Sequence, residues 1–241
     1  MKRVFDITIS SISLILLSPI LILFIILVWL SDLKNPFYLG TRIGKNGKKF
    51  RMIKLRSMTI DADKSKIDST SSNDPRITKI GKIIRKFKKD EIFQLINVLI
   101  GQMSIVGPRP NVDRDVLIYT EVEKEILSIT PGITDFSSIV FSDEGDILEN
   151  SLDPDLDYNK LIRPWKSRLA LIYVKNNGFT IDLILIFLTI ASMFSKRQSL
   201  VLLYRVLKNM TVDKKLLDVV LRKKNLTPHP PPGSSAIVDK R

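Results

Sequence analysis

The first feature of the chain is a long apolar run near the N-terminus. After Lys2 and Arg3, residues 4–30 are mostly apolar, which is enough for one helix to cross a bilayer. The run is too long for the apolar part of a cleaved signal peptide, and no small-residue cleavage site ends it. We therefore predict a helical membrane anchor over residues 1–34.

Two details of this run depart from a simple crossing. Ser18 and Pro19 stand in its middle, and a proline removes a helical hydrogen bond, so a kink is expected there. The Ser18 hydroxyl can satisfy a carbonyl one turn back. Basic residues flank both ends of the run, so the positive-inside rule gives no orientation. A re-entrant helix that bends and leaves on the same face fits both flanks, and a kinked single-pass helix is the alternative.

The middle of the chain combines short extended segments with amphipathic helices. Residues 37–58 predict short strands around the turn Asn46-Gly47, and residues 77–87 predict an amphipathic helix. Residues 112–129 predict an acidic amphipathic helix. Residues 158–175 predict a basic helix whose tryptophan and charged rim are typical of a membrane interface.

These patterns predict a mainly helical α+β fold. A second apolar run at 181–194 is short for a crossing and predicts a core or interfacial helix. The expected organisation is an anchor at 1–34, a catalytic domain at 35–197, a basic amphipathic helical extension at 198–226 and a proline-rich disordered tail at 227–241.

Composition narrows the chemistry. Lysine and arginine number 38 against 25 acidic residues, a net charge of +13, which favours an anionic partner such as a nucleic acid, a phosphorylated ligand or a membrane surface. The chain has no cysteine, and its one histidine is His229 in the tail. Thiolate metal sites, zinc sites and histidine general bases are therefore not expected, and a hard, oxygen-liganded cation such as Mg²⁺ fits better.

The adjacent carboxylates Asp90 and Glu91 are the candidate reactive groups. They follow a basic run that begins at Arg85, and a helical apolar pattern follows them and ends at Gly101. We expect both carboxylates to open this helix, so that one can face a reacting group while the other faces a cation. The alternative is an acidic first turn in front of a solvated basic face.

Further cations can meet phosphate groups. In Gly107-Pro108-Arg109-Pro110 the prolines fix the backbone around Arg109, and a pre-set guanidinium suits bidentate phosphate binding. Lys54 and Arg56 lie on an alternating apolar and basic segment, which is either a solvated strand edge or a phosphate-facing surface. The acidic residues Asp143, Glu144 and Asp146 can bind a cation or form a solvated loop.

Taken in order, these segments resemble the monotopic bacterial sugar transferases, the small polyprenyl-phosphate phosphoglycosyl transferases. The resemblance runs from about Lys2 to Arg197, and its motifs are specific only in combination. They are Lys2-Arg3-x-Phe5-Asp6, Ser18-Pro19, Arg42-x-Gly44-x-x-Gly47-x-x-Phe50, Lys54-x-Arg56-Ser57-Met58, Arg85 to Asp90-Glu91, Gln94-Leu95-x-Asn97 through Met103-Ser104, Gly107-Pro108-Arg109-Pro110, Pro131-Gly132-Ile133-Thr134 and Tyr173-Val174-Lys175-Asn176.

This resemblance implies a re-entrant helix kinked at Ser18-Pro19 and a catalytic domain on the cytoplasmic face of the bacterial inner membrane. It implies transfer of a sugar-1-phosphate from a UDP-sugar to polyprenyl (undecaprenyl) phosphate with release of UMP, at the start of an exopolysaccharide, lipopolysaccharide or capsule pathway. No nucleic-acid partner is expected. Asp90 corresponds to the nucleophile of a phosphosugar–aspartate intermediate. Glu91, beside Asp90, corresponds to a Mg²⁺ ligand, and Arg85 and Arg109 correspond to phosphate-binding residues.

One departure from the family pattern affects the substrate side. After Thr134 many relatives continue Gly-Trp-x-Gln-Val-x-Gly-Arg, whereas this chain continues Asp135-Phe136-Ser137-Ser138-Ile139-Val140 and lacks that arginine. Two other functions stay open from the residues alone. They are a membrane-tethered protein that binds anionic lipid or nucleic acid without chemistry, and a Mg²⁺-dependent nucleotide-sugar hydrolase.

Overall fold

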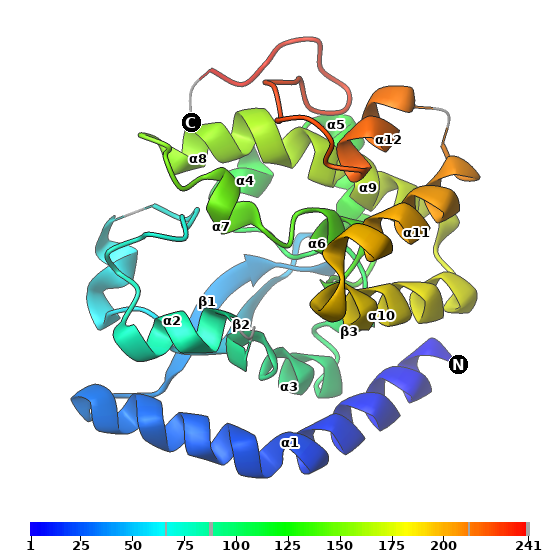
Figure 1. The fold of residues 1–241 in the computed structure, drawn as a ribbon. Helices are drawn as coiled ribbons and strands as arrows, with labels where there is room; N and C mark the ends of the chain where they lie inside the picture. The colour runs from blue at the N-terminus through cyan, green and yellow to red at the C-terminus, as the bar shows by residue number, and fades with distance from the viewer. Residues whose placement is uncertain (66, 87–88, 212, 240–241) are drawn as a thin grey trace.

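The computed structural model describes residues 1–65, 67–86, 89–211 and 213–239. One long helix, α1 (Lys2–Asp32), lies along one side of the molecule, and the remaining elements form a domain that rests on it (Figure 1). Most of the chain is helical, with short strands, so the predicted mainly helical α+β class is confirmed. Phe87 of the helix predicted at 77–87, and residues 240–241 of the predicted tail, lie outside the described residues.

The helix α1 contains Pro19 within its length. As expected, the Ser18 hydroxyl donates to a carbonyl one turn back, that of Ile15, at 2.8 Å. The ribbon of α1 changes direction about midway (Figure 1). By length and composition α1 can cross a membrane, while its path in a membrane stays a prediction.

The strands form two small sheets in the described part of the chain. Strands β1 (Phe37–Ile43) and β2 (Lys49–Leu55) form an antiparallel hairpin. Its turn contains the 3₁₀ segment Lys45–Gly47, where Asn46 and Gly47 have φ of 56° and 75°, as tight hairpin turns require. Strands β3 (Ser104–Val106) and β4 (Gly132–Thr134) are parallel. A Cβ on Gly132 would lie 2.1 Å from the Gly107 nitrogen, so only glycine permits this approach.

The remaining helices are short in the first half of the domain and longer in the second. The acidic helix predicted over 112–129 is wrong, because a capping box at Thr120 and Glu123 starts a new helix there. In chain order the elements are the 3₁₀ helix Ile60–Ser65, α2 (Lys79–Lys86), the 3₁₀ turn Lys89–Glu91, α3 (Gln94–Leu99), α4 (Asp113–Leu117), α5 (Glu121–Lys124), the 3₁₀ helix Glu125–Ser128, α6 (Phe136–Val140), α7 (Glu144–Ile147), α8 (Pro154–Asp157), the π-helix Tyr158–Ile162, α9 (Arg163–Asn176), α10 (Phe179–Phe194), α11 (Lys196–Lys208) and α12 (Lys214–Val220).

The main core lies among α6, α9, α10, α11 and α12. The expectation that the helix at 158–175 lies in a membrane interface is wrong, because Trp165 and Leu169 of α9 are buried in this core. Arg163 of α9 is also buried, and it pairs with the buried carboxylate of Glu123 at 2.6 Å. Pairing inside the protein is what allows these charges to leave water.

The segment predicted as a helical extension at 198–226 belongs to the same unit as the domain at 35–197. Leu203 and Leu207 of α11 and Val220 of α12 are fully buried in the main core. The tail beyond residue 226 was expected to be disordered, but its described residues pack on α9. The His229 ring stacks on Trp165 at 4.3 Å, and the Pro230 carbonyl accepts from Arg168 at 3.0 Å. Composition missed this because prolines lose little freedom on packing.

A second, smaller core joins α1 to the segment that carries Asp90. Leu21 and Val28 of α1 pack with Leu55, Ile84 and Phe93. Ile84 and Phe93 precede and follow Asp90, so this packing holds the Asp90-Glu91 turn against α1.

Candidate active site

The two candidate carboxylates lie on the 3₁₀ turn Lys89–Glu91, which connects α2 to α3. The prediction that Asp90 and Glu91 open the following helix is wrong, because α3 begins only at Gln94. The intervening Phe93 is buried against α1 and against the Phe37 ring, which turns the chain before the helix starts. Gly101 ends α3 as expected, with φ of +84°.

Glu91 is held by two cations from distant parts of the chain. Its Oε1 accepts from Lys54 Nζ of β2 at 3.0 Å and from Arg109 Nη2 at 2.6 Å. Burial alone would raise the pKa of Glu91, but the charges of Arg109 and Lys54 hold it far below its ordinary value. Glu91 is therefore a firmly ionised carboxylate.

Asp90 has a different environment. It is 8% exposed, and this burial raises the pKa of its carboxyl, opposed by Lys54, reinforced by the adjacent Glu91 and opposed again by Arg85. Arg85 thus lies close enough to act on Asp90 through its charge. Of the six predicted site residues, five therefore gather here: Asp90, Glu91, Arg85, Arg109 and Lys54.

Arg109 is fixed from several sides. Its Nη1 donates to the Ile133 carbonyl at 2.7 Å and its Nη2 donates to Glu91. Burial lowers the pKa of its guanidinium, but Glu91 outweighs this and the pKa lies above its usual value. The close approach of Gly107 and Gly132 places Arg109 beside β4. Arg109 is therefore pre-oriented towards the carboxylates, as an anion-binding arginine needs.

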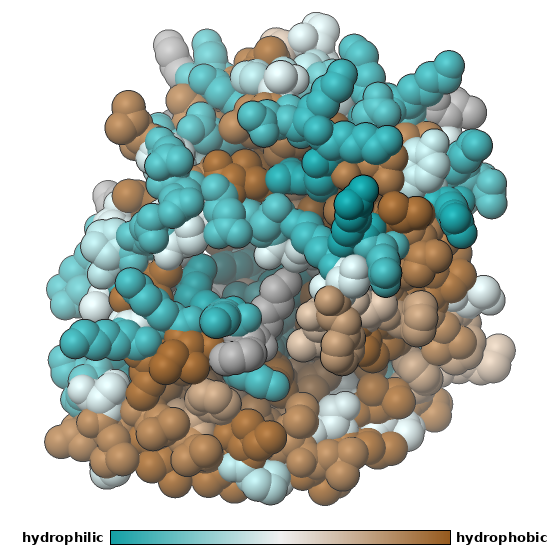
Figure 2. All heavy atoms as spheres, viewed as in Figure 1, coloured by the Kyte–Doolittle hydropathy of each residue, from teal (hydrophilic) through white to brown (hydrophobic). Residues whose placement is uncertain are grey.

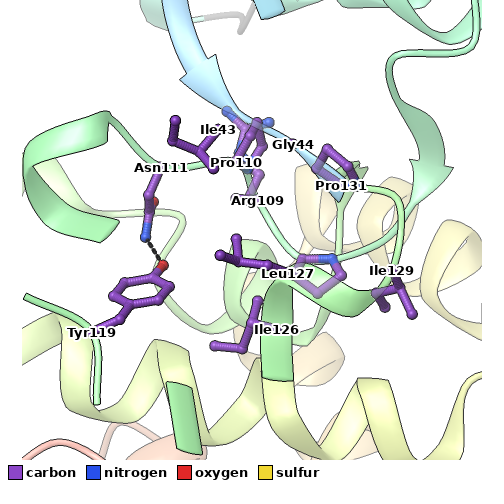
Figure 3. A pocket seen from close by; sticks show the side chains of 11 residues that line it. Ile43, Gly44, Arg109, Pro110, Asn111, Tyr119, Ile126, Leu127, Ile129 and Pro131 are labelled. Carbon is purple, nitrogen blue, oxygen red and sulfur yellow. Dashed lines mark hydrogen bonds between the residues drawn. The ribbon is translucent and has the colours of Figure 1, made fainter. Parts of the chain in front are cut away.

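The space behind the Arg109 loop is almost filled. Figure 3 shows a pocket there, with Asn111 reaching to the Tyr119 hydroxyl. Its volume is about 10 Å³, which suits one water molecule and excludes a nucleotide sugar. This packing buttresses the loop, while the Arg109 guanidinium contacts Glu91.

Arg56 does not join this group. Its guanidinium makes two hydrogen bonds of 2.6 Å to Asp32, and its Nε donates to the Asn35 carbonyl at 2.8 Å. It is buried in these contacts, so it ties the end of α1 to the end of β2. The structure therefore gives Arg56 a structural partner in the place of the expected phosphate.

Two amide side chains, those of Asn97 and Gln94, also position the site. Asn97 of α3 accepts from the Ile53 nitrogen at 2.9 Å and donates to the Arg51 carbonyl at 2.8 Å. It therefore fixes β2 next to α3 and brings Lys54 to Glu91. Gln94 is buried and accepts from Arg109 at 3.4 Å. Gln94 and Asn97 are three residues apart and lie on the buried face of α3. This helical spacing is the feature of the sequence that could have indicated their role.

The acidic loop after α6 is used by ion pairs. Asp143 lies 2.7 Å from Lys196 and 3.4 Å from Arg222, and Glu144 lies 2.8 Å from Lys166. Among the described residues no group of three or more acidic or histidine side chains is placed to hold a metal ion. The cation-binding alternative for this loop is therefore not supported.

The donor set at Asp90 and Glu91 is compatible with Mg²⁺. Lys54 and Arg109 both donate to the same Glu91 oxygen, Oε1, and Asp90 is the adjacent residue in the chain. Mg²⁺ in phosphate-transfer sites commonly uses one or two carboxylates and completes its shell with phosphate oxygens and water. Two adjacent carboxylates at a cationic surface fit that mode.

The surface around the site combines a hollow with an apolar face. Figure 2 shows the molecule hollowed between α2 and α7, with hydrophilic residues around the opening. Apolar residues cover α1 below it and α10 to one side (Figure 2). The exposed apolar side chains of α10 include Phe187, Ile190 and Phe194, and those of α1 include Ile15, Leu16 and Leu30.

Comparison with known proteins identifies the family of the chain. The sequence model described as "Bacterial sugar transferase" matches residues 1–196. The chain is 33% identical over 215 residues to an exopolysaccharide production protein, ExoY, of Sinorhizobium fredii, covering 82% of this chain and 87% of that protein. It is 34% identical over 202 residues to a UDP-glucose:undecaprenyl-phosphate glucose-1-phosphate transferase of Klebsiella pneumoniae, covering 82% of this chain but 41% of that protein.

A third relative shares a shorter segment at higher identity. It is a putative undecaprenyl-phosphate N-acetylgalactosaminyl 1-phosphate transferase of Bacillus subtilis, 47% identical over 109 residues, covering 45% of this chain and 61% of that protein. The chain belongs to the bacterial sugar transferase family. The expectation of a sugar-transferase enzyme is confirmed, and the apolar face of α1 fits a membrane-associated protein.

Proposed function

We propose that this protein transfers a sugar-1-phosphate from a UDP-sugar to polyprenyl phosphate and releases UMP. The observation that carries the proposal is the meeting of Asp90 and Glu91 with Lys54, Arg85 and Arg109 beside the membrane helix. Relatives named for UDP-sugar and undecaprenyl-phosphate substrates support this choice of donor and acceptor.

The reaction has two steps. An oxygen of Asp90 attacks the phosphorus that carries the sugar, a new P–O bond forms, and UMP leaves with the electrons of the broken P–O bond. An oxygen of polyprenyl phosphate then attacks the same phosphorus, and Asp90 leaves as a carboxylate. A carboxylate is a competent nucleophile when it is held in line with phosphorus, and neither step needs a proton transfer from histidine or cysteine.

The cationic side chains provide the positioning and charge stabilisation that phosphoryl transfer depends on. Arg109, held by Glu91 and the Ile133 carbonyl, can turn its free N–H groups to a phosphate without a large loss of freedom. Arg85 and Lys54 place positive charge near Asp90, which favours its ionised form. Mg²⁺, held by Glu91 and Asp90, would neutralise charge on the pyrophosphate.

The membrane placement brings the lipid acceptor to the nucleophile. Both ends of α1 contact the same domain, since Lys2 pairs with Asp182 and Asp32 pairs with Arg56 at 2.6 Å. This arrangement supports a re-entrant helix, because a crossing helix would leave its two ends on opposite sides of a bilayer. We place the domain on the cytoplasmic face, where nucleotide sugars are available, and assign the product to the start of a surface-glycan pathway.

The test is UMP release by the purified full-length protein from a panel of UDP-sugars, with and without polyprenyl phosphate. We expect substoichiometric release without the lipid, and turnover with it. In the Asp90→Asn variant, turnover should fall by about 10³-fold or more, because the nucleophile is absent. Mass spectrometry should detect the covalent phosphosugar adduct in the wild type and not in this variant. Sustained release that is independent of the lipid would show a hydrolase, and release from no UDP-sugar would show a binding protein.

A further inference from the structure

A groove lies where the end of α1 meets the beginning of α2. It has a volume of about 640 Å³ and is lined by residues near 31–34, 59–61 and 78–83. Figure 1 shows α2 over the C-terminal half of α1. The volume is within the range of pockets that hold small organic ligands. The described residues that line the groove include none of the five charged side chains gathered at Asp90, so the groove is separate from the candidate active site.

Two lysines, Lys34 and Lys79, bring positive charge to this groove. Both are exposed, and within the described part of the chain neither ammonium group has an ion-pair or hydrogen-bond partner. The hydroxyl-bearing residues Ser31, Thr59 and Thr78 line the same groove. Ammonium and hydroxyl groups are the donors that a phosphate group accepts from.

The two carboxylates that line the groove do not cancel this charge. Asp32 is engaged by Arg56 at 2.6 Å, and Asp61 is engaged by Lys64 at 2.8 Å. Each carboxylate is therefore compensated by a cation that is not part of the groove lining. Lys34 and Lys79 are left to attract an anion.

The groove also has an apolar part. Ile60, Ile80 and Ile83 line it, and the side chains of Ile60 and Ile83 are exposed. At the same end of α1, Leu30 and Leu33 are exposed as well. A ligand that fits this groove therefore combines an anionic group with a hydrocarbon group.

The position of the groove along α1 indicates where such a ligand comes from. Trp29 is half-exposed near the end of α1, and tryptophan is enriched at the level of the lipid headgroups. Residues 31–34 follow Trp29 directly and line the groove. With α1 in a bilayer, the groove lies at the level of the lipid phosphates.

The reacting lipid is a poor candidate for this groove. Lys79 begins α2, which has eight residues and is therefore about 12 Å long, and Asp90 comes only after its other end. A phosphate held by Lys34 and Lys79 is thus not in position to attack a phosphorus atom bound to Asp90. A phospholipid of the surrounding bilayer has the required chemistry and does not need to reach Asp90.

We propose that this groove is a binding site for an anionic phospholipid. Its phosphate lies at Lys34 and Lys79, and the first part of its acyl chains lies on Ile60 and Ile83. The site holds the end of α1 and the beginning of α2 at the membrane surface. It goes beyond the proposed reaction, because the lipid bound here is not a substrate.

The experiment is native mass spectrometry of the full-length protein, released from detergent micelles that contain phosphatidylglycerol or phosphatidylcholine with the same acyl chains. We expect the wild type to bind one phosphatidylglycerol in preference to phosphatidylcholine. The double variant Lys34→Gln/Lys79→Gln should lose about 25-fold in affinity for phosphatidylglycerol, since each lysine near an anionic lipid contributes about fivefold. Its affinity for phosphatidylcholine should change little.

Two variants separate a groove from general surface charge. Ile83→Trp fills the groove from an exposed position and keeps both lysines, so it should also lose the bound phosphatidylglycerol while its unfolding temperature stays that of the wild type. Lys45→Gln/Lys48→Gln is the matched control, because it removes two exposed lysines from the β1–β2 turn, and it should bind as the wild type does. Equal affinity for both lipids in the wild type, equal losses in the two double variants, or full binding by Ile83→Trp would overturn the proposal.

A last comparison separates this site from the acceptor site. In micelles without phospholipid, Lys34→Gln/Lys79→Gln should release UMP with a KM for polyprenyl phosphate within about twofold of the wild type. A larger rise in this KM, or one-for-one displacement of phosphatidylglycerol by polyprenyl phosphate, would assign the groove to the lipid substrate and contradict the proposal. Lipid binding is measured without turnover, so failure of the proposed reaction would leave this result standing.

Discussion

Asp90 and Glu91 are neighbours in the chain but have opposite electrostatic environments. Glu91 makes direct hydrogen bonds to Lys54 and Arg109, which keep its pKa low, whereas burial raises the pKa of Asp90. When their environments push the pKa values of two carboxylates apart, the two groups usually have different roles in the reaction. The group engaged by cations is suited to organising charge, and the less engaged group is free to attack phosphorus.

This division of roles predicts the behaviour of Glu91→Gln. The substitution keeps the shape of the side chain but removes the charge that Arg109 and Lys54 contact, and with it one proposed Mg²⁺ ligand. We expect the Mg²⁺ concentration for half-maximal UMP release to rise by about 10- to 100-fold, as for the loss of a group that supports a metal site. Titration of UMP release with Mg²⁺ measures this, and an unchanged midpoint would remove Glu91 from the metal site.

Among single residues, the sequence predicted most of the charged side chains of the site, but it did not predict the partner of each one. Asp90, Glu91, Arg85, Arg109 and Lys54 were all expected and all lie together. Arg56 was expected with them because it follows Lys54 in the same motif. Its side chain instead meets Asp32, and no local pattern reveals a partner that lies across the fold.

Among the elements, the longest and most regular patterns were the most predictable. The apolar run became α1, the run at 181–194 became α10, and the segment at 77–87 became α2 as far as it is described. The expected helix start at Asp90 was wrong because burial of Phe93 against α1 takes precedence over local propensity. The prediction that α9 lies at a membrane interface was wrong, because Arg163 and Trp165 of this helix have partners inside the protein.

The docking of the C-terminal tail on α9 can be tested by changing the pH. His229 stacks on Trp165, and its pKa lies below the usual value because of burial and the charges of Arg168 and Lys215, with Asp213 opposing them. The docked tail therefore binds a proton less readily than the free tail. Docking is strongest above the ordinary histidine pKa of about 6.5 and weakens as the pH falls below it.

The measurement is acrylamide quenching of Trp165 fluorescence in a Trp29→Phe background, between about pH 7.5 and 5. We expect quenching to increase as the pH falls, because the tail leaves the indole ring. The control is His229→Phe, which can stack on Trp165 without titrating and should give a flat profile. An equal pH response in the control would assign the change to another group.

At the scale of the whole molecule, one apolar face and one charged cleft meet along α1. The small core that holds Asp90 in place is built on Leu21 and Val28 of this helix, while other apolar side chains of α1 and α10 are exposed. The protein can therefore rest on a bilayer with Asp90, the proposed nucleophile, close to the headgroup layer. This placement would let one site use the proposed soluble nucleotide sugar and lipid phosphate.

The path of α1 through the membrane is the prediction that this arrangement makes most directly. The first turn of α1 is tied to the domain through Lys2, which contacts Asp182, the Tyr173 hydroxyl and the Val106 carbonyl. The last turn is tied to the same domain through Asp32 and Arg56. A re-entrant helix keeps both sets of contacts, whereas a single crossing must break one of them and expose the buried carboxylate of Asp182.

The chain has no cysteine, so single introduced cysteines report topology without background. We expect a cysteine placed before Met1 and another at Lys48→Cys, in the exposed β1–β2 turn, to react with a membrane-impermeant maleimide in inverted inner-membrane vesicles and to be protected in intact spheroplasts. Retained UMP release verifies that each variant is folded. Labelling of the N-terminal cysteine in spheroplasts, with position 48 still protected, would establish a crossing helix and separate Lys2 from Asp182. In that case the ion pair between α1 and α10 could not exist in the membrane-bound protein, and Lys2→Ala would leave its stability unchanged.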